Sequence, residues 1–91
     1  MPTALGLLAK VKAAYRDATV FRDKEGEKVF FYHNGCKFIL HPMPRGVRVT
    51  VKRGERQLFS GVVSSGKFDI GKFVSTLNAL VAKAPTLGRA E

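Results

Sequence analysis

The stretch "VFFYHNGCKFIL", residues 29–40, decides the fold because it places Asn34-Gly35 between two apolar runs. Asn-Gly in this setting is the strongest short-range signal for a β-hairpin with a two-residue turn. Such a turn fixes the register, so His33 is expected opposite Cys36, and each further pair shares one face of the sheet. The pattern therefore predicts two central antiparallel strands.

Further turn signals extend this hairpin into a larger sheet. Alternation with a period of two continues on both sides of it, with turns near residues 24–27, 42–46 and 54–55. The turns separate short runs in which apolar and polar residues alternate. The sequence thus predicts an antiparallel meander of five strands, near residues 18–23, 28–33, 36–41, 47–53 and 56–63.

Two segments with a helical period flank the strands. Apolar residues recur at i, i+3, i+4 and i+7 in the first 18 residues and again between residues 70 and 84, as in amphipathic helices. Thr3 is expected to begin the first helix, Asp69 to cap the second and Pro85 to end it. The chain is predicted to form a single α+β domain over residues 1–91 with both helices on one face of the sheet: a helix at about 3–17, strands at about 18–63, a helix at about 69–84 and a frayed tail at 85–91.

Strand parity sorts the side chains of the sheet onto two faces. Around Gly54-Glu55 a two-residue turn would place Val51 opposite Leu58 and Val49 opposite Ser60. The face expected under both helices holds Val20, Val29, Phe31, Phe38, Leu40, Val47, Val49, Val51, Leu58 and Val62. The other face is expected to stay open and to mix aromatic with cationic residues: Phe21, Lys28, Phe30, Tyr32, Lys37, Ile39, His41, Arg48, Thr50, Lys52, Gln57 and Phe59.

The positive charge is concentrated in the middle of the chain. Sixteen Lys and Arg oppose seven Asp and Glu, which gives a net charge of +9. Residues 36–67 carry seven basic residues and one acidic residue, so this segment alone contributes +6. An excess of this size favours polyanionic partners, of which nucleic acid is the commonest. The basic side of the first helix, Lys10, Lys12 and Arg16, is interpreted as a solvated surface.

Length and composition limit the class of protein. A chain of 91 residues suits one domain, and an apolar fraction of 45% is typical of a folded globular protein. No apolar run reaches the roughly 18 residues of a membrane span. A single Cys cannot form an intramolecular disulfide, which fits a reducing compartment. We therefore expect a cytoplasmic protein without a membrane partner.

Residues suited to catalysis or metal binding are sparse. His33, Cys36 and His41 are the candidates, and parity places His41 on the opposite face from the other two, so no zinc site is expected. His33 and Cys36 face each other across the turn, but no third group orients them as a nucleophilic pair. Ser64-Ser65-Gly66-Lys67 lacks the spacing of a P-loop. The sequence predicts a non-enzymatic protein without metal or cofactor, with a small nuclease as the less favoured alternative.

The open face predicts a small basic protein that binds DNA or RNA. Aromatic side chains on an open sheet stack on unpaired bases while Lys and Arg neutralise phosphates, which favours single-stranded or distorted nucleic acid. Tyr32, Phe59 and Phe30 are the expected stacking residues. The predicted binding residues are Lys28, Tyr32, Lys37, Arg45, Arg48, Lys52, Arg53, Arg56 and Phe59. In the alternative interpretation the aromatic face forms a homodimer or blocks an acidic surface of a nucleic-acid-handling protein.

The order helix, sheet, helix in a basic chain is similar to that of double-stranded-RNA-binding domains and of small toxins of similar fold. Residues 38–51, "FILHPMPRGVRVTV", resemble the strand pair of those toxins. The chain lacks their glycine-serine-histidine signature and is predicted to have additional strands. The sequence therefore assigns the chain to no family.

Overall fold

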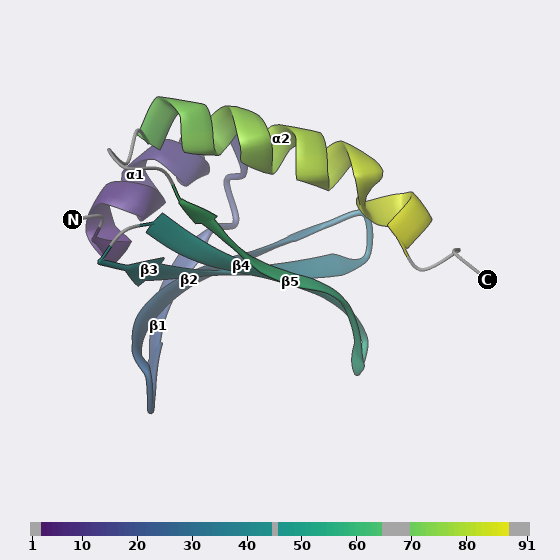
Figure 1. Ribbon diagram of the computed structural model, residues 1–91, viewed down its shortest axis with the longest axis horizontal. Coiled ribbons are helices and arrows are strands. Elements are labelled where there is room, and N and C mark those ends of the chain that lie inside the picture. The colour runs from purple at the N-terminus through teal and green to yellow at the C-terminus, as the bar shows by residue number, and fades with distance from the viewer. Residues whose placement is uncertain (1–2, 45, 65–69, 88–91) are drawn as a thin grey trace.

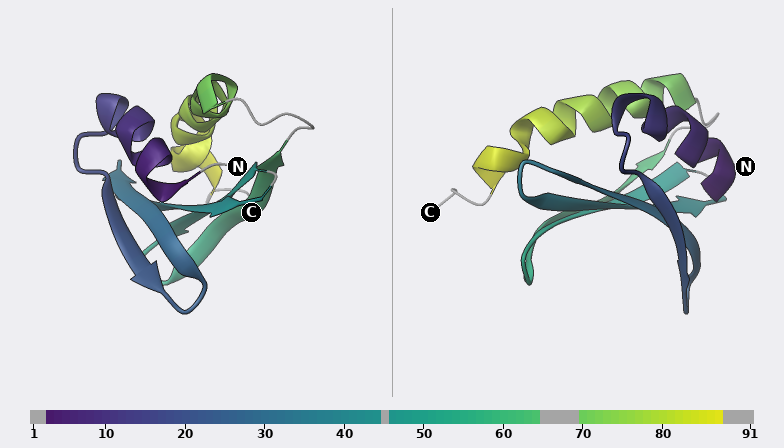
Figure 2. Two further views of the ribbon diagram at one scale, coloured as in Figure 1. Left: turned by 90° about the vertical axis from the view of Figure 1, so that its left-hand side faces the viewer. Right: turned by 180° about the vertical axis from the view of Figure 1, so that it is seen from behind.

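The fold is an antiparallel sheet covered on one side by two helices. A computed structural model describes residues 3–44, 46–64 and 70–87. The strands lie side by side in the order β1-β2-β3-β4-β5, and both helices lie on the same side of them (Figures 1 and 2). The predicted α+β meander is confirmed, and its elements are α1 (Ala4–Ala14), β1 (Thr19–Asp23), β2 (Gly26–His33), β3 (Cys36–Met43), β4 (Gly46–Arg53), β5 (Arg56–Ser64) and α2 (Ile70–Leu87).

The turn between β2 and β3 has the backbone that Asn-Gly predicts. Asn34 and Gly35 have φ angles of 51° and 79°, and a type I′ turn requires positive φ at both central residues. His33 pairs with Cys36 beside the turn, and the predicted register holds along the whole hairpin. This turn type matches the right-handed twist of the two strands, so it fixes which side chains face the helices.

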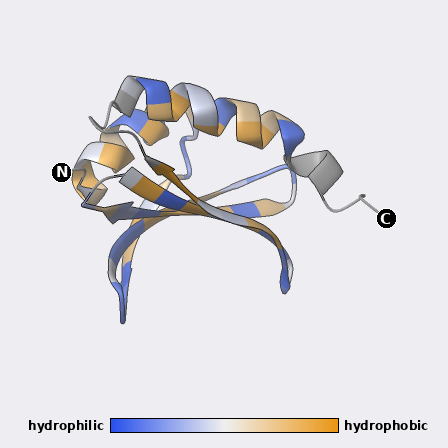
Figure 3. Ribbon diagram, in the orientation of Figure 1, coloured by the Kyte–Doolittle hydropathy of each residue, from blue (hydrophilic) through white to orange (hydrophobic). Residues whose placement is uncertain are grey.

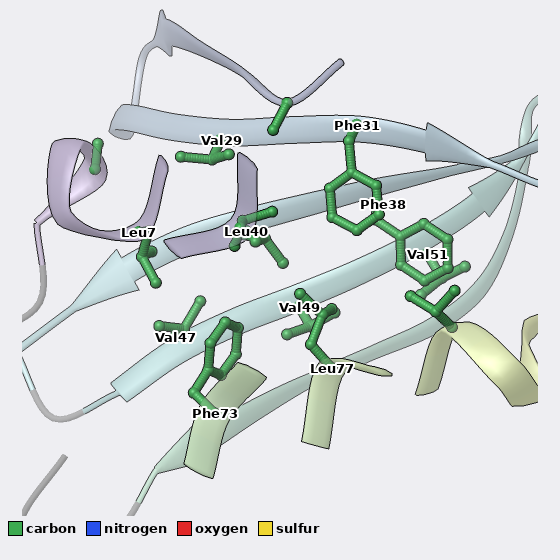
Figure 4. Packing of buried hydrophobic residues seen from close by; sticks show 14 of the residues in the cluster. Leu7, Val29, Phe31, Phe38, Leu40, Val47, Val49, Val51, Phe73 and Leu77 are labelled. Carbon is green, nitrogen blue, oxygen red and sulfur yellow. The ribbon is translucent and has the colours of Figure 1, made fainter. Parts of the chain in front are cut away.

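The face of the sheet beneath the helices, called the helix face, forms the main core. Its buried side chains are Val29, Phe31, Cys36, Phe38, Leu40, Val47, Val49 and Val51. Leu7 and Val11 of α1 and Phe73, Leu77 and Val81 of α2 pack against them (Figure 4). Burying a side chain of this size stabilises the fold by about 1.5–3 kcal/mol before the loss of chain entropy is counted, so this layer holds the molecule together.

Tyr15 connects both helices to the sheet. Its ring stacks on Phe31 with centroids 4.3 Å apart, and Phe31 stacks on Phe38 at 5.0 Å. Its hydroxyl donates a hydrogen bond of 2.6 Å to Asn78 Oδ1 in α2. Burial raises the pKa of this phenol. Tyr15 has extended backbone angles, φ −127° and ψ 92°, so α1 ends at Ala14 and not near residue 17 as predicted.

The segment after α1 supplies a hydrogen-bond acceptor for a backbone amide near the end of β2. β1 begins at Thr19, which pairs with Phe30, so its ladder with β2 stops before Tyr32. Asp17 Oδ2 accepts a hydrogen bond of 3.0 Å from the Tyr32 amide beyond the end of that ladder. An amide without a partner would weaken the sheet by about 1–3 kcal/mol where it is shielded from water. The early end of α1 thus gives the strand an acceptor.

The register between β4 and β5 differs from the prediction. Lys52 pairs with Gln57 as expected, but Val51 pairs with Phe59 and not with Leu58. Leu58 is the extra residue of a β-bulge, in which two residues of one strand lie opposite one residue of its neighbour. The prediction assumed an uninterrupted ladder beyond the Gly54-Glu55 turn and was therefore wrong from this point on.

The bulge moves Phe59 and Val62 to the faces opposite to those predicted. Phe59 shares the helix face with Val51, and its ring covers Gly61, where an added Cβ would lie 3.1 Å from Phe59 Cζ. Val62 lies on the other side of the sheet and is 49% exposed, whereas Val63 packs against the core. A shift of one residue has this effect because side chains alternate along a strand.

α2 continues to Leu87, past its predicted end at Pro85. A proline in a helix removes the hydrogen bond to the carbonyl four residues earlier, and here that loss falls in the last turn. The predicted frayed tail is therefore wrong for Pro85–Leu87, while residues 88–91 and the predicted cap Asp69 lie outside the described residues. Neither helix in the described segments has the length and apolarity of a membrane span.

Replacing Phe38 with Ala is expected to lower the free energy of unfolding by about 3–5 kcal/mol, because the change removes a fully buried ring from the stack on Phe31 and leaves a cavity. Leu5→Ala is the matched control: Leu5 is 72% exposed, and such surface changes stay within about 0.5 kcal/mol. Urea denaturation of both variants gives the difference. Equal losses would contradict the assignment of Phe38 to the core.

Candidate functional site

The sheet face opposite the helices, called the open face, is built from cross-strand rows. Neither described helix covers it (Figure 2). The row that crosses β2 to β5 nearest the Asn34-Gly35 turn, called the first row, consists of Tyr32, Lys37, Lys52 and Gln57. The next rows contain Phe30, Ile39, Thr50 and Ser60, and then Phe21 with Lys28 and His41 with Arg48 and Val62.

The sheet bends around the open face. The tips of the β1–β2 and β4–β5 hairpins both point away from the helices, so the open face lies on the inside of the bend (Figure 1). Both tips are hydrophilic (Figure 3). A ligand resting on the open face would therefore meet polar hairpin ends on two sides.

Three aromatic side chains on β1 and β2 form a continuous cluster. Phe21 meets Phe30 edge to face with centroids 5.4 Å apart, and Phe30 meets Tyr32 in the same way at 5.9 Å. Phe21 and Phe30 are half-buried, whereas Tyr32 is 55% exposed. Tyr32 is thus the ring of this cluster that offers a large accessible surface, and Phe30 braces it from the side.

Lys37 lies directly over this cluster. Its Nζ is 4.8 Å from the centroid of the Phe30 ring and 5.9 Å from that of Tyr32. Both distances are within the range of cation–π interactions. Phe30 is half-buried and lies closer to this ammonium group than Tyr32 does, so Phe30 supports its neighbours and does not offer a free platform for stacking, in contrast to the expectation from sequence.

Lys52 and Arg48 on β4 add positive charge to the same face as Lys37. Lys52 lies opposite Lys37, and Arg48 lies opposite His41. Neighbouring strands are about 4.8 Å apart, so the backbones of Tyr32 and Lys52 are separated by about 10 Å across the first row. Like charges directly opposite each other destabilise a sheet. Within the described segments no carboxylate forms an ion pair with these cations.

Lys28, by contrast, is compensated by two carboxylates. Its Nζ lies 2.9 Å from Asp23 Oδ2 and also contacts Glu25, and its side chain is 11% exposed. The hydrogen bond from Lys28 is the largest cause that lowers the pKa of each carboxyl. Burial alone would lower the pKa of Lys28, but both carboxylates outweigh burial and raise it. This pairing argues against the predicted role of Lys28 as a phosphate ligand.

Three of the remaining predicted site residues, Arg53, Arg56 and Phe59, do not lie on the open face. Arg53 and Arg56 form the last pair before the turn and, like Phe59, have the parity of the helix face. The guanidinium Nη2 of Arg53 lies 3.6 Å from the Sγ of Cys36 on that side. Arg45 lies outside the described residues. The structure thus brings Tyr32, Lys37 and Lys52 together in the first row and places Arg48 on the same face, two rows further along β4.

Sequence reasoning missed two residues of this surface, Ser60 and Val62, and the packing of a third. Val62 reaches the open face only because of the bulge, and no turn or Gly signal in the sequence marks that bulge. The position of Lys37 over Phe30 follows from the register of β2 with β3, which the Asn34-Gly35 turn already specifies. That contact was therefore accessible from the pairing of the two strands.

Cys36 belongs to the core. Its side chain is fully buried, and the ring of His33 packs edge-on against Tyr15 with centroids 5.7 Å apart. His41 lies on the open face, as parity predicts. The described segments contain no group of three His, Cys, Asp or Glu residues that suits a metal ion. A buried thiol is not presented to an external substrate, so Cys36 is assigned a packing role.

Comparison of the chain with known protein families, with curated proteins and with solved structures found no match. The open face is therefore interpreted from its own geometry and charge. Its distinguishing features are an exposed ring and uncompensated cations on a sheet surface without a covering helix.

Lys28→Met is expected to raise the pKa of Asp23 and of Glu25 towards their ordinary values of 3.8 and 4.5, because it removes the ammonium group that stabilises both carboxylates. Lys24→Met removes an equal charge from the same turn and is the matched control. NMR titration of the side-chain carboxyl carbons measures both pKa values. An identical titration in the two variants would contradict the ion pairs.

The same ion pairs predict how stability changes with pH. The pKa values of Asp23 and Glu25 are lowered in the folded state, so their contribution is present above 3.8 and 4.5 and is lost as the pH falls through the folded values. The pKa of Lys28 is raised, so its contribution is present below 10.5 and is lost as the pH rises further. The stability difference between wild type and Lys28→Met should therefore shrink at both extremes.

Proposed function

We propose that the open face binds single-stranded nucleic acid, with a base stacked on Tyr32 and with phosphates held by Lys37, Lys52 and Arg48. The first row carries this proposal, because it places the most exposed ring of the aromatic cluster beside two uncompensated lysines. A nucleotide presents a flat ring and a nearby phosphate. Stacking platforms flanked by cations are how sheet surfaces hold unpaired strands.

The electrostatics of the first row favour an anion. Lys37 and Lys52 lie opposite each other on β3 and β4, and like charges in this arrangement disfavour a sheet. A phosphate between them would replace this repulsion with two charge-assisted contacts, which are about twice as strong as neutral hydrogen bonds. Release of counterions from the nucleic acid adds to the affinity and makes it dependent on salt.

The ring of Tyr32 favours unpaired over paired bases. Bases inside a duplex stack on one another and leave no face for a side chain, whereas a single strand or a distorted site does. The apolar sides of α1 and α2 are packed on the helix face, so neither helix supplies an apolar anchor to the open face. Every base has an aromatic face, so the expected ligand is DNA or RNA without a strong sequence preference.

The double variant Arg48→Ala/Lys52→Ala is expected to bind a mixed-sequence oligonucleotide more weakly and with a flatter salt dependence. If each cation neutralises one phosphate, the slope of log K against log salt falls by about 1.4, which is about 0.7 for each contact with a single strand. Fluorescence anisotropy with a labelled oligonucleotide at several salt concentrations measures both effects.

The control for this experiment is Lys10→Ala/Lys12→Ala, which removes the same charge from exposed positions of α1. Because α1 lies on the other side of the sheet, this variant should keep nearly all of the affinity and slope. If both variants lost the same affinity, the binding would depend on net charge alone and not on the open face. No binding by the wild type at low salt would remove the proposal and favour an acidic protein as the partner of the open face.

Tyr32→Ala is expected to weaken binding by about 1–3 kcal/mol, or roughly 5- to 150-fold, because one stacked base loses its platform. Tyr32→Phe keeps the ring and should bind like the wild type. The same anisotropy titration measures both variants. If Tyr32→Ala binds as tightly as the wild type, stacking on this ring does not contribute.

Tyrosine emission gives a second readout of the same contact. The chain has two tyrosines and no tryptophan, so Tyr32 is the only fluorophore of this kind in Tyr15→Phe. A stacked base should quench its emission as the oligonucleotide saturates the protein. Unchanged emission at saturation would show that bound nucleic acid does not reach the ring.

A further inference from the structure

The two edges of the sheet are protected to different degrees. β1 is five residues long and ends in Arg22 and Asp23, and short, charged edges resist pairing with another chain. β5 is nine residues long, and its last six residues, 59–64, contain neither a charge nor a proline. The unpaired N–H and C=O groups along such an edge are a template for a further strand.

Exposed apolar side chains also concentrate on β5. Four large apolar side chains are exposed within the described segments, and two of them, Phe59 at 36% and Val62 at 49%, belong to this strand. Phe59 lies on the helix face and Val62 on the open face. The outer edge of β5 therefore carries one exposed apolar side chain on each face of the sheet, with Ser60 beside Val62 on the open face, and an added strand could cover both.

We propose that β5 pairs in an antiparallel manner with β5 of a second copy of this chain. The two copies are related by a two-fold axis that passes between Gly61 and its counterpart. In this register Phe59 lies opposite the partner's Val63 on the helix face. Ser60 lies opposite the partner's Val62 on the open face. A two-fold axis makes each contact occur twice, and Gly61 opposite its own copy leaves room for the Phe59 ring that covers it.

The charges of the chain are compatible with this pairing. Arg56 is the one charged residue of β5, and it lies five positions from Gly61, at the far end of the strand. Arg48 lies opposite Val62 on the neighbouring strand. In the dimer the two Arg48 backbones are three strand spacings apart, or about 15 Å, which exceeds the Debye length of about 8 Å at physiological salt. Like-charge repulsion across the interface is therefore screened.

A second copy is the occupant that the edge itself specifies. It brings a strand of the same length, without charge over the paired segment, and it matches an exposed ring with an apolar side chain on one face. The two-fold axis is perpendicular to the sheet, so the two open faces join into one surface and the four helices lie together on the other. This inference does not depend on the proposed function, and it places self-association at the β5 edge and not on the aromatic cluster.

Two matched variants test the pairing and its register. In Ser60→Glu/Val62→Glu, each glutamate at position 60 lies opposite a glutamate at position 62 of the partner, so the dimer should dissociate. In Ser60→Lys/Val62→Glu, opposite charges meet at the same places and the dimer should persist. Both positions are exposed, so both variants should fold, and circular dichroism checks this.

Sedimentation equilibrium over a range of concentrations measures the mass. The wild type and Ser60→Lys/Val62→Glu are expected at twice the monomer mass of 10.0 kDa, and Ser60→Glu/Val62→Glu at that mass. In the wild type, protection of β5 amides from hydrogen exchange should also rise with protein concentration. A monomeric wild type, or a dimer that Ser60→Glu/Val62→Glu leaves intact, would overturn the proposal. A monomeric Ser60→Lys/Val62→Glu would overturn the register centred on Gly61.

Discussion

Side-chain alternation along the β2–β3 hairpin ties the core and the open face to each other. The Asn34-Gly35 turn sets one register, and that register sends Phe31 and Phe38 under the helices and Phe30 and Lys37 to the opposite side. A slip by one residue would bury the ammonium of Lys37 among apolar side chains, where an unpaired charge is strongly unfavourable. The burial of the aromatic stack therefore also fixes which cations reach the surface, so stability and ligand binding depend on the same turn.

The two faces differ in how many stabilising contacts their side chains make with one another. On the helix face, Tyr15 continues the stack of Phe31 and Phe38 and bonds to Asn78, so rings and helices support each other. On the open face, Lys37 lies opposite Lys52, whereas Lys28 on the same face is neutralised by Asp23 and Glu25. Among the described residues, carboxylates thus pair with Lys28 but not with Lys37 or Lys52, and such a row is tolerated where a strong core offsets its effect on folding.

Local signals predicted the parts of the fold that local chemistry determines. Asn34-Gly35 specified both the turn and its register, because only a turn with two positive φ angles suits that dipeptide between twisted strands. The end of α1 was missed because Tyr15 and Ala18 continue the helical spacing, yet Tyr15 leaves the helix to stack on Phe31, a contact with a distant segment. The neutralisation of Lys28 was missed for a related reason: it depends on how the turn after β1 folds back, and parity describes only which face a residue occupies.

The bulge at Leu58 has consequences well beyond the one residue it inserts. Without it, Phe59 would lie on the open face beside Tyr32, and Val62 would lie beneath the helices. With it, Phe59 covers Gly61 on the helix face and Val62 is exposed on the open face, so each face of β5 carries an exposed apolar side chain at the edge of the described sheet. The bulge therefore removes a ring from the candidate nucleic-acid surface and places it where a second copy would bury it. A sequence without a Gly or Pro at the insertion gives no indication of this change, and for that reason parity succeeded on β1 to β4 and failed on β5.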